Sequence, residues 1–184
     1  MCDKITCMDI FIINKKNTNN ISDDLLREFE HKNFSNKKKW QEHCLAYLML
    51  DRILKEVYKI SDREIEFINN KPHLRNKKKF FSLSHSEDYV VIAFSNSDCG
   101  IDIELIKERD YKKIAKRMKL RSNSIEEFYY DWTKYEAEYK LKNKTKSLHQ
   151  TRIENYILTA VSSNPQEIFE IYIQNRELFP NLQN

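Results

Sequence analysis

The sequence is poor in the residues that build tight phosphate-binding loops and disulfide frameworks. It has one glycine in 184 residues, Gly100, and only three prolines. Loops of the Walker or dinucleotide-binding type need several glycines close together, so they are excluded, and any nucleotide must be bound by side chains. The four cysteines have no CxxC spacing and no neighbouring histidine cluster. Neither a zinc site nor a disulfide framework is predicted, and reduced thiols are expected.

Long apolar runs are also missing. The mean hydropathy is −0.75, and the apolar run at residues 8–13 is interrupted by Asp9 and is too short for a signal-peptide core. We therefore expect a soluble cytoplasmic protein without an export signal. An aromatic content of 12% argues against disorder, and the length suits one domain or two small lobes. The net charge of +4 favours an anionic partner without identifying it.

The first 80 residues predict a strand, a long helix and a loop. The isoleucine-rich residues 5–13 predict a strand, and the polar residues 14–20 a turn. A helix-start signal lies at residues 22–24, and apolar residues at helical spacing predict a long helix over about 38–58. A second start signal at 61–64 leads into a short apolar run, and residues 69–72 then predict a loop.

The rest of the chain predicts a sheet flanked by helices. Residues 80–84, 89–95 and 100–104 predict three strands at the centre of a sheet. Residues 111–120 predict a basic helix, 125–140 an aromatic-striped helix and 156–162 a final strand, before a tail around 168–173. The order of elements predicts an α+β fold and suits two similar halves.

Asp102 and Glu104 form the most informative pair. They lie two apart in the predicted strand 100–104, so both side chains project from the same face. Two neighbouring carboxylates repel each other unless a cation neutralises them, and hard oxygen ligands favour Mg²⁺ or Mn²⁺ over Zn²⁺. The alternative is an exposed strand face that carries two solvated acids.

A second candidate group lies on the predicted helix 125–140. Glu136 and Lys140 are one helical turn apart, so they share a face. Glu136 could complete a three-carboxylate metal site while Lys140 neutralises a phosphate; the alternative is an ordinary surface ion pair. Trp132, with Phe128 and Tyr135, is interpreted as a stripe that faces the core.

The third candidate is the segment Phe81-Ser82-Leu83-Ser84-His85-Ser86. Its hydroxyls and its imidazole can donate hydrogen bonds to an anion. No glycine flanks the serines, so a nucleophile elbow is excluded, and the alternative is a turn capped by serines. The lysine runs at 37–39, 77–79 and 112–119 are interpreted as solvated surface rather than a nucleic-acid interface.

Four segments in order, Lys71-Pro72, Phe81 to Ser86, Gly100 to Glu104 and Trp132 to Lys140, resemble the motif series of the 4'-phosphopantetheinyl transferases, in particular the two-lobed Sfp-like branch. The resemblance implies a fold of two pseudo-symmetric α+β lobes in one chain, with residues 1–95 and 96–184 as the lobes and the active site between them. It also implies transfer of the phosphopantetheine arm of coenzyme A to a serine of an acyl or peptidyl carrier protein, with release of 3',5'-ADP.

The resemblance assigns a role to each motif residue. It implies Asp102, Glu104 and Glu136 as ligands of Mg²⁺, with Mn²⁺ as a possible substitute. Glu136 and Lys140 are the implied catalytic residues, Glu136 taking the proton of the carrier serine and Lys140 contacting the phosphates. The implied coenzyme A-binding residues are Lys71, Ser84, His85 and, in place of a family arginine early in the long helix, His43.

The sequence departs from the family pattern at several places. Asn70 and Glu87 stand where the family has glycine, Ser82 replaces an asparagine, and Tyr135 replaces the lysine before the motif glutamate. The second lobe is also expected to be short, because little sequence remains between Lys140 and the predicted last strand.

Two other functions compete with the transferase. The first is a degenerate relative that binds coenzyme A or a carrier protein without efficient transfer. The second is a basic nucleic-acid-binding module, with binding that depends steeply on salt. The expected partners are a carrier protein and coenzyme A, with no nucleic acid and no membrane. The strand and helix before Lys71 favour a monomer.

Overall fold

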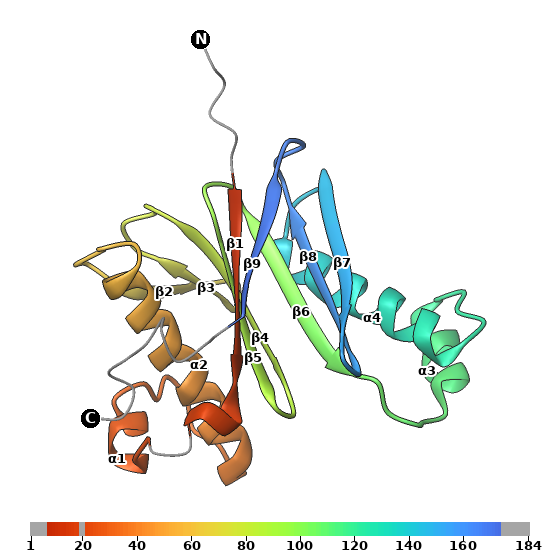
Figure 1. Ribbon diagram of the computed structural model, residues 1–184, viewed down its shortest axis with the longest axis horizontal. Coiled ribbons are helices and arrows are strands. Elements are labelled where there is room, and N and C mark those ends of the chain that lie inside the picture. Colours follow the sequence, from red (N-terminus) through yellow and green to blue (C-terminus); the bar gives the residue numbers. More distant parts are fainter. Residues whose placement is uncertain (1–6, 19–20, 174–184) are drawn as a thin grey trace.

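The computed structural model describes residues 7–18 and 21–173 and confirms the α+β class (Figure 1). The first two residues of the expected first strand, two of the expected turn, and Cys2 lie outside the described residues. The helices are α1 (Asp23–Arg27), α2 (Lys37–Glu56), α3 (Tyr111–Met118) and α4 (Ile125–Leu141), with a short 3-10 helix at Lys15–Thr18. The strands are β1 (Cys7–Asn14), β2 (Ile65–Ile68), β3 (Lys71–Leu74), β4 (Phe80–Ser86), β5 (Tyr89–Ser95), β6 (Cys99–Leu105), β7 (Ser147–Ile153), β8 (Tyr156–Ser162) and β9 (Ile168–Ile173).

The first sheet has the strand order β4-β5-β1-β9. Its central strands are apolar on both faces, and every residue of β5 is buried. One face packs against α2, which starts with an N-cap at Asn36. The second half of this helix is buried on every side, because residues 44–50 are all buried, as are Ile53 and Leu54. This layer forms the larger core and lies on the left of Figure 1.

The second sheet has the order β6-β8-β7, and its strands are antiparallel. One of its faces packs against the first sheet through a shared core that includes Ile10, Val91, Ile101 and Leu158. The helix α4 covers the opposite face, and α3 packs against α4 at the outer end (Figure 1). The molecule is therefore layered as helix, sheet, sheet and helix.

The loop expected at residues 69–72 is confirmed only for residues 69–70, because residues 65–74 form the hairpin β2–β3 and Lys71 and Pro72 belong to its second strand. Its two-residue turn consists of Asn69 and Asn70, which have φ of 50° and 63°. Asparagine adopts these positive φ values more readily than most residues, and a turn of this kind matches the twist of paired strands. The start signal at 61–64 begins no helix, because the chain enters β2 directly.

Three further expectations need correction. The tail at 168–173 is strand β9, which runs parallel to β1 at the edge of the first sheet, so β8 is not the final strand. Polar strand β7 lies between α4 and β8, where little was expected, because an edge strand can remain half-exposed and lacks an apolar run. The strands β4, β5 and β6 do not form the centre of one sheet: β4 and β6 are edges of different sheets.

The single glycine lets α4 approach β6 closely. A Cβ atom on Gly100 would lie 2.0 Å from the carbonyl oxygen of Ala137 and 3.0 Å from the backbone nitrogen of Leu141. No side chain larger than hydrogen fits against this backbone. Gly100 thus sets the distance between the strand of Asp102 and the helix of Glu136. Among the described residues, no helix is long and apolar enough to cross a membrane.

Candidate active site between the two sheets

A row of serines joins the edge strands β4 and β6. Ser82, Ser84 and Ser86 share one face of β4, as the period of a strand requires. Ser82 accepts a hydrogen bond from the Ile101 N–H (3.1 Å), and Ser86 accepts one from the Leu105 N–H (3.1 Å). Both bonds span 19 residues, so β4 and β6 run side by side in parallel. Hydroxyl groups here take the place of a backbone ladder, and we refer to Ser82, Ser84 and Ser86 with their partners on β6 as the serine seam.

Asp102 is buried at the middle of the seam. Its side chain is 6% exposed, and its Oδ1 accepts hydrogen bonds from Ser84 Oγ (2.7 Å) and Lys140 Nζ (2.8 Å). Its Oδ2 is buried and has no hydrogen-bond partner. The alternative of a solvated strand face is therefore wrong for Asp102. A buried carboxylate oxygen without a donor is costly, and a bound cation would satisfy it.

Glu104 and Glu136 add two carboxylates beside Asp102. Burial raises the pKa of both groups above the ordinary value, and the negative charge of Asp102 raises it further. Glu104 receives a hydrogen bond from Ser86 Oγ (3.1 Å), and the nearby indole N–H of Trp132 lowers the pKa of its carboxyl. Both carboxylates are half-buried. Such a group of acids favours the binding of positive charge.

The helix α4 supplies Lys140 and Trp132 to the site. Lys140 does not form the ordinary surface pair with Glu136: its ammonium donates to Asp102 and to the carbonyl oxygen of Ile101 (3.0 Å). Trp132 packs on Phe128 with ring centroids 5.7 Å apart, which agrees with the predicted core stripe, and also reaches Glu104. Tyr135 is 42% exposed, so its place in that stripe is wrong.

These residues line a pocket of about 660 Å³ between the first and second sheets. It brings together all eight site residues expected from the sequence, although they come from five separate elements. These eight residues are His43, Lys71, Ser84, His85, Asp102, Glu104, Glu136 and Lys140. The volume is in the range of pockets that bind small molecules and cofactors.

The expected phosphate-binding residues differ in their burial and in whether other protein groups already bond them. The ammonium of Lys71 is buried, where it pairs with Asp98 and donates to the Cys99 carbonyl (3.0 Å). The His85 imidazole is 40% exposed, with Nδ1 3.5 Å from a carboxylate oxygen of Glu42. Ser84 and His85 lie within strand β4, so the alternative of a serine-capped turn is wrong. The turn follows at residues 87–88.

One wall of the pocket is aromatic and was not anticipated from the sequence. His43 contacts Tyr47 (centroids 4.7 Å apart) and Phe34 (4.8 Å), and its Nε2 is buried without a hydrogen-bond partner. Burial lowers the pKa of His43 to about 4, with a smaller contribution from the charge of Lys32. The neutral imidazole is thus the ordinary form. His31 and Phe67 extend this wall, and no sequence motif marked them.

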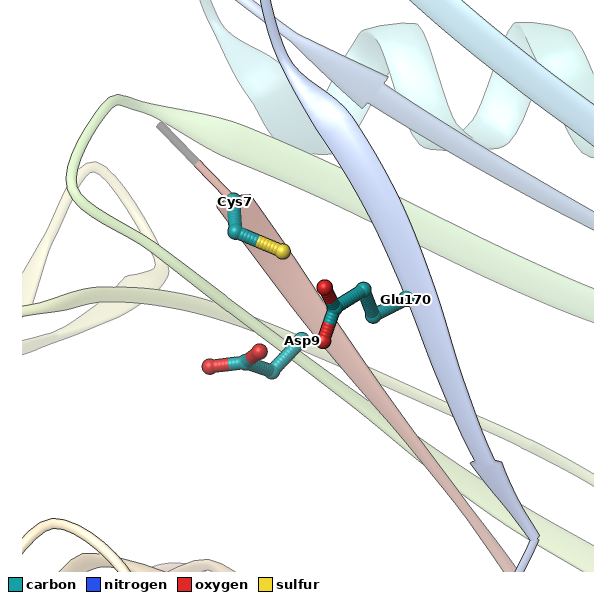
Figure 2. A group of neighbouring side chains, drawn as sticks. All are labelled: Cys7, Asp9 and Glu170. Carbon is teal, nitrogen blue, oxygen red and sulfur yellow. The ribbon is translucent and has the colours of Figure 1, made fainter. Parts of the chain in front are cut away.

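The residues fit a divalent cation by donor chemistry. Asp102, Glu104 and Glu136 offer only oxygen, which Mg²⁺ prefers, and Asp102 Oδ2 has no other partner. The three carboxylates are not drawn together as tightly as Cys7, Asp9 and Glu170, a second group with metal-binding side-chain types among the described residues (Figure 2).

The group Cys7, Asp9 and Glu170 is held by hydrogen bonds that need no metal. Its side chains come from the paired strands β1 and β9. Tyr58 donates to Asp9, Tyr172 donates to Glu170 (2.6 Å), and the Cys7 thiol bonds Glu170. Burial, together with these acids, raises the pKa of Cys7 to about 11, so the thiol keeps its proton.

Comparison with known proteins gives one named similarity. No family model matches the sequence. The chain is 32% identical over 114 residues to the 4'-phosphopantetheinyl transferase gsp of Aneurinibacillus migulanus, and the match covers 54% of this chain and 47% of that protein. The chain thus spans about half the length of the curated relative it matches. At the level of the superfamily, this similarity supports the resemblance carried by the four motifs.

Proposed function

We propose that this protein is a Mg²⁺-dependent 4'-phosphopantetheinyl transferase. It transfers the phosphopantetheine arm of coenzyme A to a serine hydroxyl of an apo acyl or peptidyl carrier protein and releases 3',5'-ADP. The observation that carries the proposal is the buried Asp102, whose Oδ2 has no hydrogen-bond partner and which lines a pocket together with Glu104, Glu136 and Lys140. The similarity to a transferase of this name supports it.

In this proposal the fold is that of the two-lobed Sfp-like transferases, with residues 1–95 and 96–184 as the lobes. The strand β9 would then belong to the second lobe in sequence and to the first in hydrogen bonding, because it pairs with β1. In this proposal the protein acts as a monomer, since the pocket draws its residues from both sheets of one chain. Its proposed location is the cytoplasm. Neither nucleic acid nor a membrane takes part.

Asp102, Glu104 and Glu136 would hold the cation. When bound, Mg²⁺ neutralises negative charge on the pyrophosphate oxygens and on the leaving group. Lys140 already lies 2.8 Å from Asp102, so its ammonium can serve the same phosphates as a fixed positive charge. Three features position the carboxylates and the ammonium group. Gly100 sets the distance between β6 and α4, Ser84 bonds Asp102, and Ser124 caps the start of α4.

Glu136 would accept the proton of the carrier serine. It is half-buried and lines the pocket beside Lys140, so a carrier serine that enters the pocket could reach its carboxylate. His85 would donate a hydrogen bond to a coenzyme A phosphate, and His43 would contact coenzyme A at the aromatic wall. The single hydroxyl hydrogen of Ser84 is directed to Asp102, so Ser84 would have to turn it from that carboxylate to a phosphate. Lys71 would have to share its ammonium between a phosphate and Asp98.

The test is the intact mass of an apo carrier protein after incubation with coenzyme A, Mg²⁺ and the purified protein. We expect the mass to rise by one phosphopantetheinyl arm, and EDTA to prevent the rise. Asp102→Ala and Glu136→Ala should reduce the rate at least about a hundredfold while the far-UV spectrum stays unchanged. Lys37→Ala, which removes only a surface pair with Asp23, should transfer at the wild-type rate.

The competing functions predict different results in this assay and in direct measurements of binding. Wild-type rates in both acid variants would contradict the metal site. A folded protein that binds coenzyme A but modifies neither acyl nor peptidyl carriers would instead support the degenerate, binding-only relative. Tight, salt-dependent binding of DNA or RNA without a divalent cation would support the nucleic-acid-binding module.

A further inference from the structure

The serine seam reaches the carboxylates of the pocket as well as the backbone of β6. Among the described residues, Ser82 bonds the Ile101 N–H and no carboxylate, whereas Ser86 bonds both the Leu105 N–H and Glu104 Oε2. A hydroxyl has one hydrogen and free rotation about its C–O bond. Because the Leu105 N–H occupies an acceptor position of Ser86, the hydroxyl hydrogen is directed toward Glu104.

Glu104 is held from two separate elements. Ser86 approaches it from β4 in the first sheet, and the indole of Trp132 approaches it from α4, which covers the second sheet. Trp132 is itself fixed by its packing on Phe128. Donors on two rigid elements limit rotation of a carboxylate more than one donor does, and an indole N–H can only donate. The orientation of Glu104 is therefore set by the fold before any ligand binds.

We propose that Ser86 and Trp132 are positioning residues that hold Glu104 in the orientation in which it binds the divalent cation. The inference rests on the proposed function, because it assigns a task to residues around the proposed metal ligands. Residues that orient a ligand in this way change metal affinity 10- to 100-fold in other proteins. Neither residue needs to contact coenzyme A or the carrier.

A structural role and a positioning role differ in what they change. A structural role lowers the stability of the fold, whereas a positioning role lowers cation affinity even when the fold is intact. The seam offers a variant for the first case, Ser82→Ala, which removes a bond to the backbone and none to a carboxylate. Ser122→Ala is a second control, since it removes a serine-to-carboxylate bond to Asp131 (2.6 Å), a residue of α4 that does not line the pocket.

The experiment measures Mn²⁺ affinity by electron paramagnetic resonance of free Mn²⁺, with the full chain and without coenzyme A. We expect Ser86→Ala and Trp132→Phe each to weaken Mn²⁺ binding about tenfold. Ser86→Thr keeps the hydroxyl and should stay within about twofold of wild type. Ser82→Ala and Ser122→Ala should bind Mn²⁺ like the wild type, although Ser82→Ala should melt at a lower temperature.

The transfer assay provides the second readout. For Ser86→Ala, the apparent KM for Mg²⁺ should rise about tenfold, with kcat at saturating Mg²⁺ close to that of wild type. If the wild type transfers normally but both variants keep wild-type Mn²⁺ affinity, the positioning role is overturned and the transferase stands. If the folded wild type neither binds Mn²⁺ nor transfers, the proposed function is overturned, and this inference with it.

Discussion

Asn70 and Glu87 have left-handed backbone conformations at positions where the family that the sequence resembles has glycine. Their φ values are 63° and 41°. Glycine adopts this region without steric cost, asparagine at little cost and glutamate at a larger one. The Glu87 carboxylate pairs with Lys107 and Lys38, which lower its pKa to about 2. The departures from the family pattern therefore keep the backbone shape that glycine would give.

His43 is expected to make stability depend on pH. Its pKa is about 4 in the folded protein against an ordinary 6.5, so the unfolded chain binds more protons between these values. The contribution is complete above pH 6.5 and is lost as the pH falls toward 4. Between pH 7 and pH 5 the wild type should lose about 1 kcal/mol more unfolding free energy than His43→Gln, after allowance for partial exposure.

Urea unfolding at the two pH values checks this expectation. The other histidines with lowered pKa values, His31, His73, His85 and His149, are present in both proteins, so the difference between the proteins reports His43 and its interactions with His31 and His85. Equal losses in wild type and His43→Gln would show that the aromatic wall admits the charged imidazole.

At the scale of elements, Gly100 determines how α4 meets β6. A Cβ atom at this position overlaps the Ala137 carbonyl, which is backbone and cannot rotate away. Gly100→Ala should lower the unfolding free energy by about 3 kcal/mol, measured by chemical denaturation. The double variant with Ala137→Gly should not recover it, because the carbonyl remains. Wild-type stability in Gly100→Ala would mean that α4 can shift without cost.

Glu167 is expected to fasten the two sheets together. It is 8% exposed, and its two oxygens accept hydrogen bonds from Ser95 of β5 (2.9 Å) and Ser162 of β8 (2.7 Å). Glu167→Ala leaves both buried hydroxyls without this acceptor and should lower the unfolding free energy by about 2 kcal/mol. Glu126→Ala, which breaks an exposed pair with Arg152, should cost less than about 1 kcal/mol and serves as the control.

At the scale of the whole molecule, the two sheets share one core and should unfold together. Met8, Ile10 and Val91 of the first sheet pack against Ile103 and Leu158 of the second. We expect calorimetry to show a single transition with equal calorimetric and van't Hoff enthalpies. Two resolved transitions would show that the proposed lobes are independent folding units, which their shared core does not favour.

Much of the local structure was readable from the sequence. Helical spacing predicted α2, α3 and α4, and the start signal at 22–24 is confirmed by α1 with its N-cap at Ser22. Apolar runs predicted β1, β4, β5, β6 and β8, each close to its observed bounds. The polar strand β7 and the exposed strand β9 were missed, because edge strands lack a strong pattern. The hairpin β2–β3 was missed because its turn depends on the asparagines 69 and 70 at positive φ rather than on glycine.

The sequence by itself determined the carboxylate spacing of Asp102 and Glu104 and the helical turn between Glu136 and Lys140. These follow from periodicities of two and 3.6, which are local properties of the chain. The other candidate residues, His43, Lys71, Ser84 and His85, were expected in the pocket only through the family resemblance. Only the tertiary structure decided that Lys140 bonds Asp102, that Lys71 is engaged by Asp98, and that Ser86 and Trp132 hold Glu104. Such contacts join residues from different strands and helices, and their distances depend on how closely the layers pack.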